Sequence, residues 1–285
     1  MLQSLRHIKS RIRSIESTRK LTHAMEMVSI AKLKRTQSAF EKSGKYTFKV
    51  EALLKSILSS DKMISHPFLD ERLDKKNVLL CVITSDTGLC GPYNHNVIRA
   101  AETFLKNYQP DTIRLVTVGK KGFIHFNRKN FKVVNSYVGL NGRYSPKICE
   151  GMLNILIDMF LSKQADEVYI AYTHPETASR RKPVIEKLLN IVRLPGAKPV
   201  DYIYETPISS ILDDLIPMYL SNKIKTIMLD SFTSEHQARA IAMGEATENA
   251  TDLLSGLILM RNKVRQANIT KEMLEIISSA EALKG

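Results

Sequence analysis

The stretch SFTSEHQARAIAMGEATENATDLLSGLILMRNKVRQANITKEMLEIISSAEALKG (residues 231–285) decides the fold of this chain. It contains no proline, and small or apolar residues recur along it at alternating steps of three and four. This spacing keeps one face of a helix against a partner when the two wind around each other with a left-handed twist. The stretch therefore predicts a long coiled-coil helix with a seam of Met243, Ala246, Ala250, Leu253, Leu257, Met260, Val264 and Ala267.

The partner helix is predicted at the other end of the chain. All ten prolines lie between Pro67 and Pro217, so neither end meets the cost of a proline inside a helix. A helix over residues 1–60 would be about 80 Å long and would need a buried stripe to stay folded. That stripe is predicted to slip between Glu16 and Lys20, and its expected members are Ile8, Ile12, Ile15, Leu21, Met25, Val28 and Leu33.

Between the two ends, strand-like and helix-like segments alternate. The run NVLLCVIT (77–84) is apolar throughout, which is typical of a strand buried on both faces. Further strands are expected at 112–118 and 167–172, and helices at 96–108, 120–129 and 145–162. Such alternation predicts a mostly parallel sheet with covering helices.

Three segments follow from this division: an N-terminal coiled-coil helix (1–60), an inserted α/β globular domain (70–205), and a C-terminal coiled-coil helix (208–285) that pairs with the first. The predicted fold class is α/β, with a long antiparallel α-helical coiled coil formed by the two terminal helices.

Charge is distributed unevenly along the 285 residues, whose formal net charge is +13. Residues 1–60 hold 13 Lys and Arg against 4 Asp and Glu, a net +9, whereas residues 231–285 hold 6 against 7, a net −1. A basic helix beside a neutral one predicts an acidic partner, which could be nucleic acid, anionic lipid or protein. The chain has no apolar run of about 18 residues, so we expect no membrane span. Its three scattered cysteines indicate a reducing compartment.

No pattern of catalytic or ligand-binding residues stands out, so we expect no catalytic residues, no cofactor and no metal. The loop TSDTGLCGPYN (84–94) follows a buried strand, as a phosphate-binding loop would, but it lacks the glycine and lysine spacing of such loops. We expect a structural turn there, and a nucleotide site is the alternative. The seven histidines show no metal-ligand spacing.

Two other features of the helices leave alternatives open. The basic N-terminal helix could belong to a nucleic-acid-binding or scaffolding adaptor, although its basic residues alternate with residues suited to a core. The C-terminal end is apolar around most of its circumference, which is typical of a buried helix. Either residues 1–15 cover that end, or another protein does.

Three motifs resemble the gamma subunit family of F-type ATP synthases, the central rotor shaft. They are IKSRIRSIESTRKLTHAMEMVSIAKLKRTQ (8–37), SEHQARAIAMGEATENA (234–250) and RNKVRQANITKEMLEII (261–277), and the loop 84–94 also resembles the family's. The resemblance spans essentially the full length. It implies a coiled coil with an inserted Rossmann-like α/β domain, set in the bore of a hexamer of alternating alpha and beta subunits.

The resemblance further implies a non-catalytic rotor stalk subunit that transmits torque to the catalytic hexamer from the membrane ring. The implied partners are the alpha and beta subunits, the epsilon subunit and the ring of c subunits, without nucleic acid. The implied location is peripheral, at the cytoplasmic face of a bacterial cell membrane or on the matrix side in an organelle. The residues expected to contact alpha and beta subunits are Lys9, Arg13, Met25, Lys34, Glu235, Arg239, Gln266, Thr270, Glu272, Ile276 and Ile277.

The sequence departs from the family pattern at a few positions. Gly244 stands where the family usually has lysine, Pro92 where glycine is common, and Ser278-Ser279 where a Val-or-Ser and Gly pair is usual. These departures affect the contacts expected locally. No cysteine follows Cys149, so the regulatory cysteine pair of photosynthetic relatives is not expected.

Overall fold

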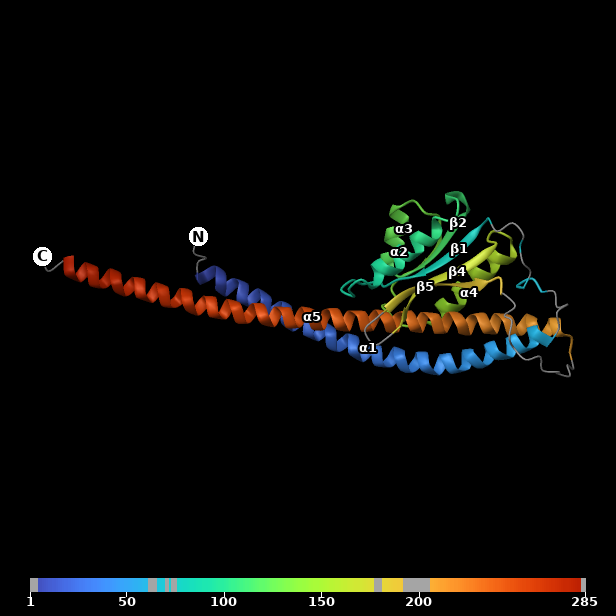
Figure 1. The fold of residues 1–285 in the computed structure, drawn as a ribbon, viewed down its shortest axis with the longest axis horizontal. Helices are drawn as coiled ribbons and strands as arrows, with labels where there is room; N and C mark the ends of the chain where they lie inside the picture. The colour runs from blue at the N-terminus through green and yellow to red at the C-terminus, as the bar shows by residue number, and fades with distance from the viewer. Residues whose placement is uncertain are drawn as a thin grey trace. The chain divides into compact units, whose positions relative to one another are not determined.

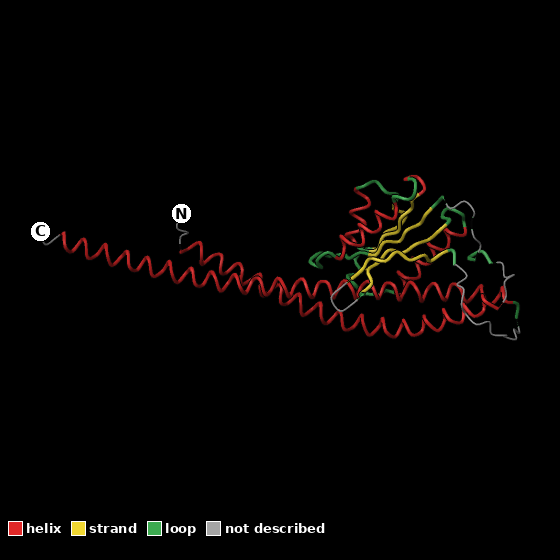
Figure 2. Tube along the Cα trace, in the orientation of Figure 1, coloured by secondary structure: helices red, strands yellow, loops and turns green. Residues whose placement is uncertain are grey.

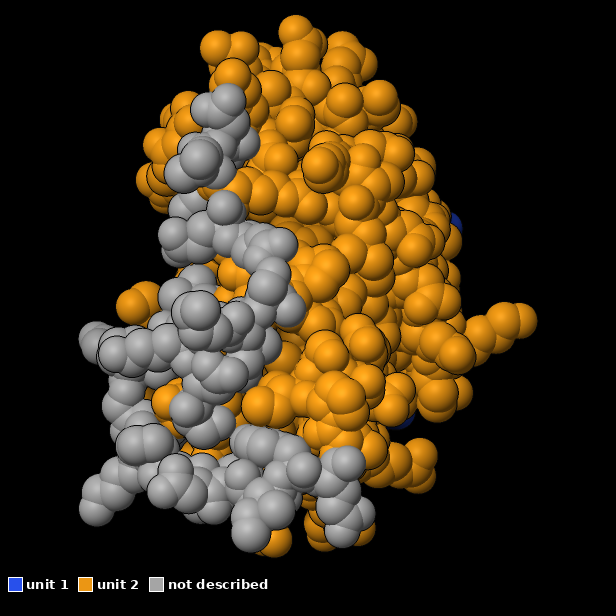
Figure 3. All heavy atoms as spheres, turned by 90° about the vertical axis from the view of Figure 1, so that its right-hand side faces the viewer, with its two compact units in different colours: residues 1–28, 240–285 blue, residues 29–239 orange. Residues whose placement is uncertain are grey.

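The computed structural model describes residues 5–60, 66–69, 72, 76–176, 181–191 and 206–282. Two long helices, α1 (Leu5–Ser60) and α5 (Ile208–Ala282), enclose an α/β region in the sequence (Figure 1). The predicted fold class is confirmed: terminal helices pair antiparallel and the strands between them form a mostly parallel sheet. The chain divides into two compact units, residues 1–28 with 240–285 and residues 29–239, coloured separately in Figure 3. The predicted domain boundaries stay a prediction.

In the first unit, α1 and α5 run antiparallel. The hydroxyl of Thr247 donates to that of Thr22 at 2.8 Å. One turn further along α1, Glu26 lies beside Gly244, where an added Cβ would be 3.3 Å from the Glu26 carboxylate. Residue numbers therefore increase along α1 in the direction in which they decrease along α5, as in an antiparallel pair. The glycine that departs from the family pattern leaves room for the Glu26 side chain.

The buried face of α1 follows an unbroken heptad pattern, and the predicted slip between Glu16 and Lys20 is wrong. Leu21 and Val28, placed in the predicted stripe, are 61% and 56% exposed. The inward positions recur at steps of four and three, and many of those after the first turns are polar. A stripe chosen by apolar residues alone therefore includes residues on the exposed face of the helix. The inward residues are Ile8, Ile12, Ile15, Arg19, Thr22, Glu26, Ser29, Leu33, Thr36, Phe40, Ser43, Thr47, Val50, Leu54 and Ile57.

The seam of α5 also differs from the prediction at every second position. Leu253 and Met260 are 59% and 41% exposed, and Ala267 is exposed as well, so these three assignments are wrong. The neighbouring Leu254 is 7% exposed and takes the inward place. The seam shares Met243, Ala250, Leu257 and Val264 with the predicted one, and its full membership is Met243, Thr247, Ala250, Leu254, Leu257, Arg261 and Val264.

In the second unit, part of the seam between the same two helices is polar. The hydroxyl of Thr226 on α5 lies 2.8 Å from that of Ser43 and 2.9 Å from that of Thr47, both on α1. Thr47 also donates to the backbone carbonyl of Asn222 at 3.3 Å. Directional bonds of this kind fix the register of two helices more sharply than apolar contacts do.

The sheet of the second unit, whose strands are yellow in Figure 2, has the strand order β3-β2-β1-β4-β5. Its strands are β1 (Val78–Ile83), β2 (Ile113–Val118), β3 (Val133–Tyr137), β4 (Glu167–Pro175) and β5 (Arg181–Leu189). Only β5 runs antiparallel to its neighbour. Strands β3 and β5, which form the two edges of the sheet, are not predicted by the sequence pattern. Edge strands carry polar residues and proline, here Pro183, and so lack a continuous apolar run.

Successive residues of β1 point into two separate cores. Leu79, Cys81 and Ile83 pack with α4 (Pro146–Leu161) and α5. The alternate β1 residues pack with α2 (Tyr93–Leu105) and α3 (Lys120–Arg128), which lie on the other side of the sheet from α4 and α5 (Figure 1). This alternation explains why the strand is apolar throughout. The helices predicted at 96–108, 120–129 and 145–162 are confirmed with small shifts at their ends.

We predict that Leu254→Ala destabilises the paired helices of the first unit by about 2–4 kcal/mol, because it removes a buried side chain and leaves a cavity. The matched control is the adjacent Leu253→Ala, which should change the free energy of unfolding by less than about 0.5 kcal/mol, because its side chain is exposed. Denaturant titrations followed by helical circular dichroism compare the two. Equal losses would contradict the seam described here.

Candidate functional site

A stretch of α5 between residues 224 and 239 is buried almost all the way round. Its polar side chains lie in the second unit and contact the loops at the carboxyl ends of the strands. Buried polar groups are costly unless they are bonded, so their partners define what this stretch does. The buried polar residues are Asp230, Ser231, Thr233, Ser234, Glu235, His236 and Arg239.

Arg239 joins α5 to the loop that follows β1. Its side chain forms an ion pair with Glu235, one turn earlier, with Nη1 2.8 Å from Oε1. Nε donates to the carbonyl oxygen of Gly88 at 3.2 Å, and Nη2 donates to the carbonyl and hydroxyl oxygens of Thr87 at 3.3 and 3.1 Å. One guanidinium therefore binds a helix residue and a loop more than 140 positions away in sequence.

The carboxylate of Glu235 is buried. Its side chain is 1% exposed, and burial raises its pKa although Arg239 opposes that shift. Among the described residues, its second oxygen has no hydrogen-bond partner. An unbonded buried oxygen carries a free-energy cost, which indicates that Glu235 serves to orient Arg239 rather than to stabilise the fold.

The loop 84–94 is held by hydrogen bonds to two other loops of the second unit, which favours the structural turn over a nucleotide site. The carboxylate of Asp86 accepts hydrogen bonds from the backbone amides of Lys120, Gly139 and Asn141, at 3.0, 2.9 and 2.7 Å. A phosphate bound after a strand would take amide donors of this kind. Asp86 thus supplies a negative charge of the protein's own where a bound phosphate would sit.

Two further contacts fasten the same stretch of α5. The hydroxyls of Tyr93 and Ser231 lie 2.8 Å apart. His236 Nε2 lies 3.0 Å from the carbonyl oxygen of Gly142, and burial lowers the pKa of His236 to about 4, so the ring is neutral and donates its Nε2 proton. Gly142 has φ of +69°, and an added Cβ would lie 2.5 Å from the His236 ring. Only glycine fits this approach.

The residues predicted to contact partners separate into two groups. Most are exposed on the helices, and Met25 is half-buried. Glu235 and Arg239 are the exceptions, because their side chains point into the second unit and are 1% and 8% exposed. Their partner contacts stay a prediction, and the structure gives them an intramolecular role that the sequence did not indicate. The exposed residues are Lys9, Arg13, Lys34, Gln266, Thr270, Glu272, Ile276 and Ile277.

The apolar end of α5 is exposed in the part of the chain that the structure describes. Ile276 and Ile277 are 69% and 56% exposed, and Met273 and Leu274 are 60% and 59% exposed. The described residues of α1, which begin at Leu5, therefore do not cover this end, and the first four residues of the expected 1–15 stretch lie outside the described residues. Exposed apolar surface of this kind is typical of a contact with another molecule, and that contact stays a prediction.

The functional residues that the sequence pattern does not predict are those of the loops, together with His236 on α5. Thr87, Gly88 and Asp86 were read only as parts of a turn, and His236 was read as an isolated histidine. The sequence does indicate that this loop is a candidate site, because it follows a buried strand and loops of this kind meet at one edge of a parallel sheet. What the sequence could not supply was the helix that comes to lie against that edge.

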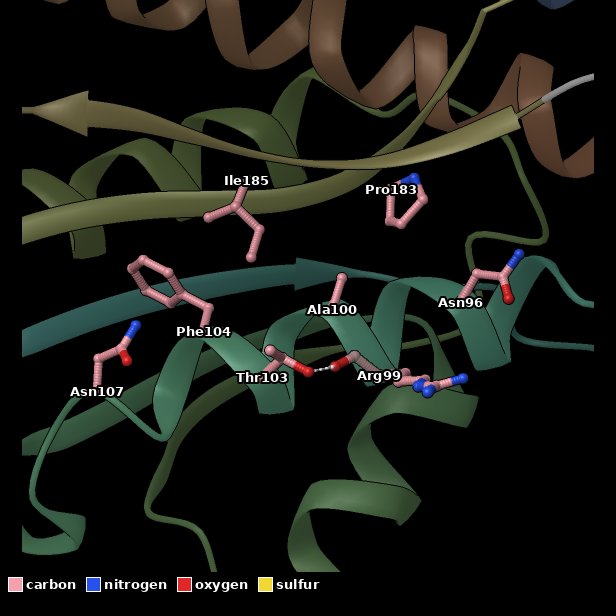
Figure 4. Close-up of a pocket in the computed structure, with 8 residues that line it drawn as sticks. All are labelled: Asn96, Arg99, Ala100, Thr103, Phe104, Asn107, Pro183 and Ile185. Atoms are coloured by element: carbon pink, nitrogen blue, oxygen red, sulfur yellow. Dashed lines mark hydrogen bonds between the residues drawn. The ribbon is translucent and has the colours of Figure 1, made fainter.

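A shallow groove of about 590 Å³ lies between α2 and the edge strand β5 (Figure 4). Its lining mixes apolar residues such as Phe104 and Ile185 with polar ones, and Thr103 donates to the backbone carbonyl of Arg99 at 2.9 Å. The lining has no charged pair or nucleophile in an activating setting. Within the described residues, no group of three His, Cys, Asp or Glu could hold a metal, and no helix is long and apolar enough to cross a membrane.

Asp230 gives a further buried contact between α5 and the sheet. Its Oδ2 lies 2.6 Å from Nδ1 of His174 on β4. Burial raises the pKa of Asp230 from 3.8 to about 6, and His174 opposes the rise while the charge of Glu186 adds to it. The folded chain therefore holds this proton more tightly than the unfolded chain between those two values. Its contribution to stability is present below pH 3.8 and is lost as the pH rises through about 6.

We predict that Asp230→Asn reduces the loss of stability between pH 5 and pH 7 by roughly 1 kcal/mol, because asparagine cannot ionise. Thermal unfolding at a series of pH values measures the change. The control Asp214→Asn, at an exposed position on the same helix, should leave the pH profile as in the wild type. A profile unchanged by Asp230→Asn would contradict the raised pKa.

Comparisons with known proteins agree with this architecture. A family model described as ATP synthase matches residues 4–283. The ATP synthase gamma chain of Protochlamydia amoebophila is 37% identical over 99% of this chain and 100% of its own length. The ATP synthase gamma chain of Anaeromyxobacter sp. is 36% identical with the same coverage.

Solved structures show the same fold. A chain of the mitochondrial ATP synthase of Euglena gracilis (OSCP/F1/c-ring, rotational state 3) aligns with a TM-score of 0.67 and 17% identity, over 98% of this chain and 94% of its own. A chain of the central stalk/c-ring structure from Tetrahymena thermophila aligns with a TM-score of 0.61 and 23% identity, over 79% and 99%. Because a family model and full-length relatives both match from end to end, the chain belongs to the ATP synthase gamma chain family.

Proposed function

We propose that the paired helices α1 and α5 carry torque between the ion-driven membrane ring of a rotary ATP synthase and its catalytic hexamer of alpha and beta subunits. As a member of the gamma chain family, the chain is a rotor stalk subunit and is itself non-catalytic. The observation that carries the proposal is the antiparallel pairing of two long helices. Most of the residues expected to contact alpha and beta subunits are exposed on the surface of these helices.

Torque transmission requires resistance to twisting, and the seam supplies it. A single helix can turn about its own axis without losing any contact, whereas two helices interlocked every three to four residues cannot. In the first unit, Ile8 on α1 and Leu254 on α5 are 0% and 7% exposed, so the interlocked face excludes water.

The two helices give the shaft an uneven charge. Lys9 and Arg13 are exposed on the N-terminal helix, whereas the C-terminal helix carries more acidic than basic residues after Ala240. A subunit that turns among three chemically identical catalytic sites must present a different face to each. We propose that the basic face of residues 9–35 pairs transiently with acidic loops of the beta subunits, and that Met25 lies near the same contact.

The exposed end of α5 is proposed to turn inside the hexamer. Apolar contacts are not directional, so a tip bearing Ile276 and Ile277 can rotate within a ring of side chains without breaking oriented bonds. Just below it, Gln266, Thr270 and Glu272 are exposed and can form hydrogen bonds with a beta subunit in one orientation. This end of α5 would then combine an apolar tip that rotates freely with a polar segment that binds a beta subunit in one orientation.

The α/β domain is proposed to contact the epsilon subunit and the ring of c subunits. This would place the chain peripherally, at the cytoplasmic face of a bacterial membrane or the matrix side in an organelle. The Tetrahymena structure is that of a central stalk and c-ring, and the similarity of its fold to this chain supports the proposal. The alternative of a nucleic-acid-binding adaptor has no support from the full-length relatives.

Co-expression with alpha and beta subunits tests the proposal directly. Affinity purification through a beta-subunit tag should recover one copy of this chain per hexamer of three alpha and three beta subunits. Recovery of the hexamer without this chain would overturn the assignment. Equilibrium dialysis of the isolated chain with ATP tests the alternative of a nucleotide site in the loop 84–94, because that alternative requires the isolated chain to bind ATP.

We predict that the triple charge reversal Lys9→Glu, Arg13→Glu and Lys34→Glu weakens torque transmission, because it replaces attraction to acidic loops with repulsion. Each exposed pair contributes on the order of 0.5 kcal/mol, so the combined loss should lower affinity for the hexamer roughly tenfold. Ion pumping per ATP hydrolysed in the reconstituted complex measures the coupling.

A matched control reverses three other exposed lysines of α1, Lys42, Lys45 and Lys49, which lie outside the face proposed to meet beta subunits. Coupling should stay close to wild type in that control. Equal coupling in both triple variants would show that net charge, rather than the position of the charge, explains any effect.

For the tip, we predict that the double variant Ile276→Ala and Ile277→Ala leaves the isolated chain about as stable as the wild type, within roughly 0.5 kcal/mol, because both side chains are exposed. In the assembled complex it should lower the melting temperature, because the same side chains would then be buried. Differential scanning calorimetry of chain and complex provides the comparison. A large loss of stability in the isolated chain would contradict the exposure described here.

A further inference from the structure

We propose that Arg239 is a positioning residue for torque transmission, which locks the loop after β1 to α5 so that helix and α/β domain turn as one body. The inference rests on the proposed function, because only a chain that carries torque needs such a lock. Its basis is the set of bonds from one guanidinium to Glu235, Thr87 and Gly88.

Apolar packing alone would leave this junction free to slip. Between Leu212 and Phe232, the inner face of α5 packs against the sheet and α4 mainly through apolar side chains, with one directional contact between Asp230 and His174 near its end. The apolar contacts resist separation of the two surfaces but are not directional, so a helix under load can rotate or slide across them. Directional bonds are needed where helix and domain must keep one orientation.

Arg239 supplies these bonds at the end of the packed stretch. The guanidinium is planar and its donors are fixed relative to one another, so bonds to Gly88 and Thr87 define both a distance and an angle. Lysine could pair with Glu235 or reach the loop, but it could not fix the same geometry. The adjacent contacts of Ser231 with Tyr93 and of His236 with Gly142 hold the helix to two other points of the domain.

The energetics point the same way. A buried ion pair contributes little net stability compared with apolar residues of similar size, because both charges lose their hydration. Glu235 keeps an oxygen without a partner among the described residues, which adds to that cost. The arrangement is therefore poor as a stabilising device and well suited to holding a loop in one orientation.

The test uses two variants that loosen the lock from opposite sides, each assembled into the reconstituted complex. Arg239→Lys keeps the charge beside Glu235, and Thr87→Val removes the hydroxyl acceptor while leaving the buried ion pair intact. The control is Thr103→Val, which removes an exposed hydroxyl of α2 that bonds only within its own helix. Hydrogen exchange of the amides of residues 85–91 reports the loop, and ion pumping per ATP hydrolysed reports the coupling.

We expect the amides of residues 85–91 to exchange about tenfold faster in Arg239→Lys, because one bond to a charged group is worth about 1.5 kcal/mol or more. Ion pumping per ATP should fall in both variants, and the double variant should lose less than the two single losses combined, since both act on one contact. The control should match the wild type in both measurements.

Three outcomes would overturn the proposal: a looser loop with unchanged pumping per ATP, an unchanged loop in both variants, or single losses of pumping that simply add. Failure of both variants to assemble would also overturn it, by showing that Arg239 is needed for folding. The outcome is separate from that of the proposed function, because one copy per hexamer in the wild-type complex is established first.

Discussion

The structure depends on one constraint, which is that α1 and α5 keep a common seam while running in opposite directions. A seam that returns every seven residues holds two helices together only if neither drifts around the other. On α1 the inward positions keep this spacing from Ile8 to Ile57. Within the second unit, the three hydroxyls of Ser43, Thr47 and Thr226 then fix the pairing, where apolar side chains would tolerate a shift.

The same constraint explains why the α/β domain is attached as it is. A helix can be wound into a coiled coil on one side and still offer its other side to a sheet, and α5 does both between residues 224 and 239. This stretch has little surface left for water, so its polar side chains must find partners inside the protein. Asp230, Ser231, His236 and Arg239 each find one on β4 or in the loops near the carboxyl ends of the strands.

The fold could be read from the sequence, whereas the details of its contacts could not. The absence of proline from both ends and the apolar run of β1 were enough for the helices and the central strand. The seam was misread where its residues are polar, as at Arg19 and Thr22, because an apolar pattern carries no information about a polar face. The position of Arg239 was out of reach as well, since its loop partners lie about 150 residues earlier and no local pattern connects them.

The edge of the sheet where α5 docks is also where α/β proteins of this topology bind nucleotides. Here Asp86 takes up backbone amides that a phosphate would need, and α5 lies against the neighbouring loop through Arg239. A domain that held a nucleotide at this edge would have to open and close there with each binding event. In this chain the carboxylate of Asp86 and the helix α5 occupy the place of a nucleotide. The edge of the sheet is therefore a fixed contact between helix and domain instead of a binding pocket. A fixed contact suits a subunit that rotates as one body while catalysis takes place on other subunits.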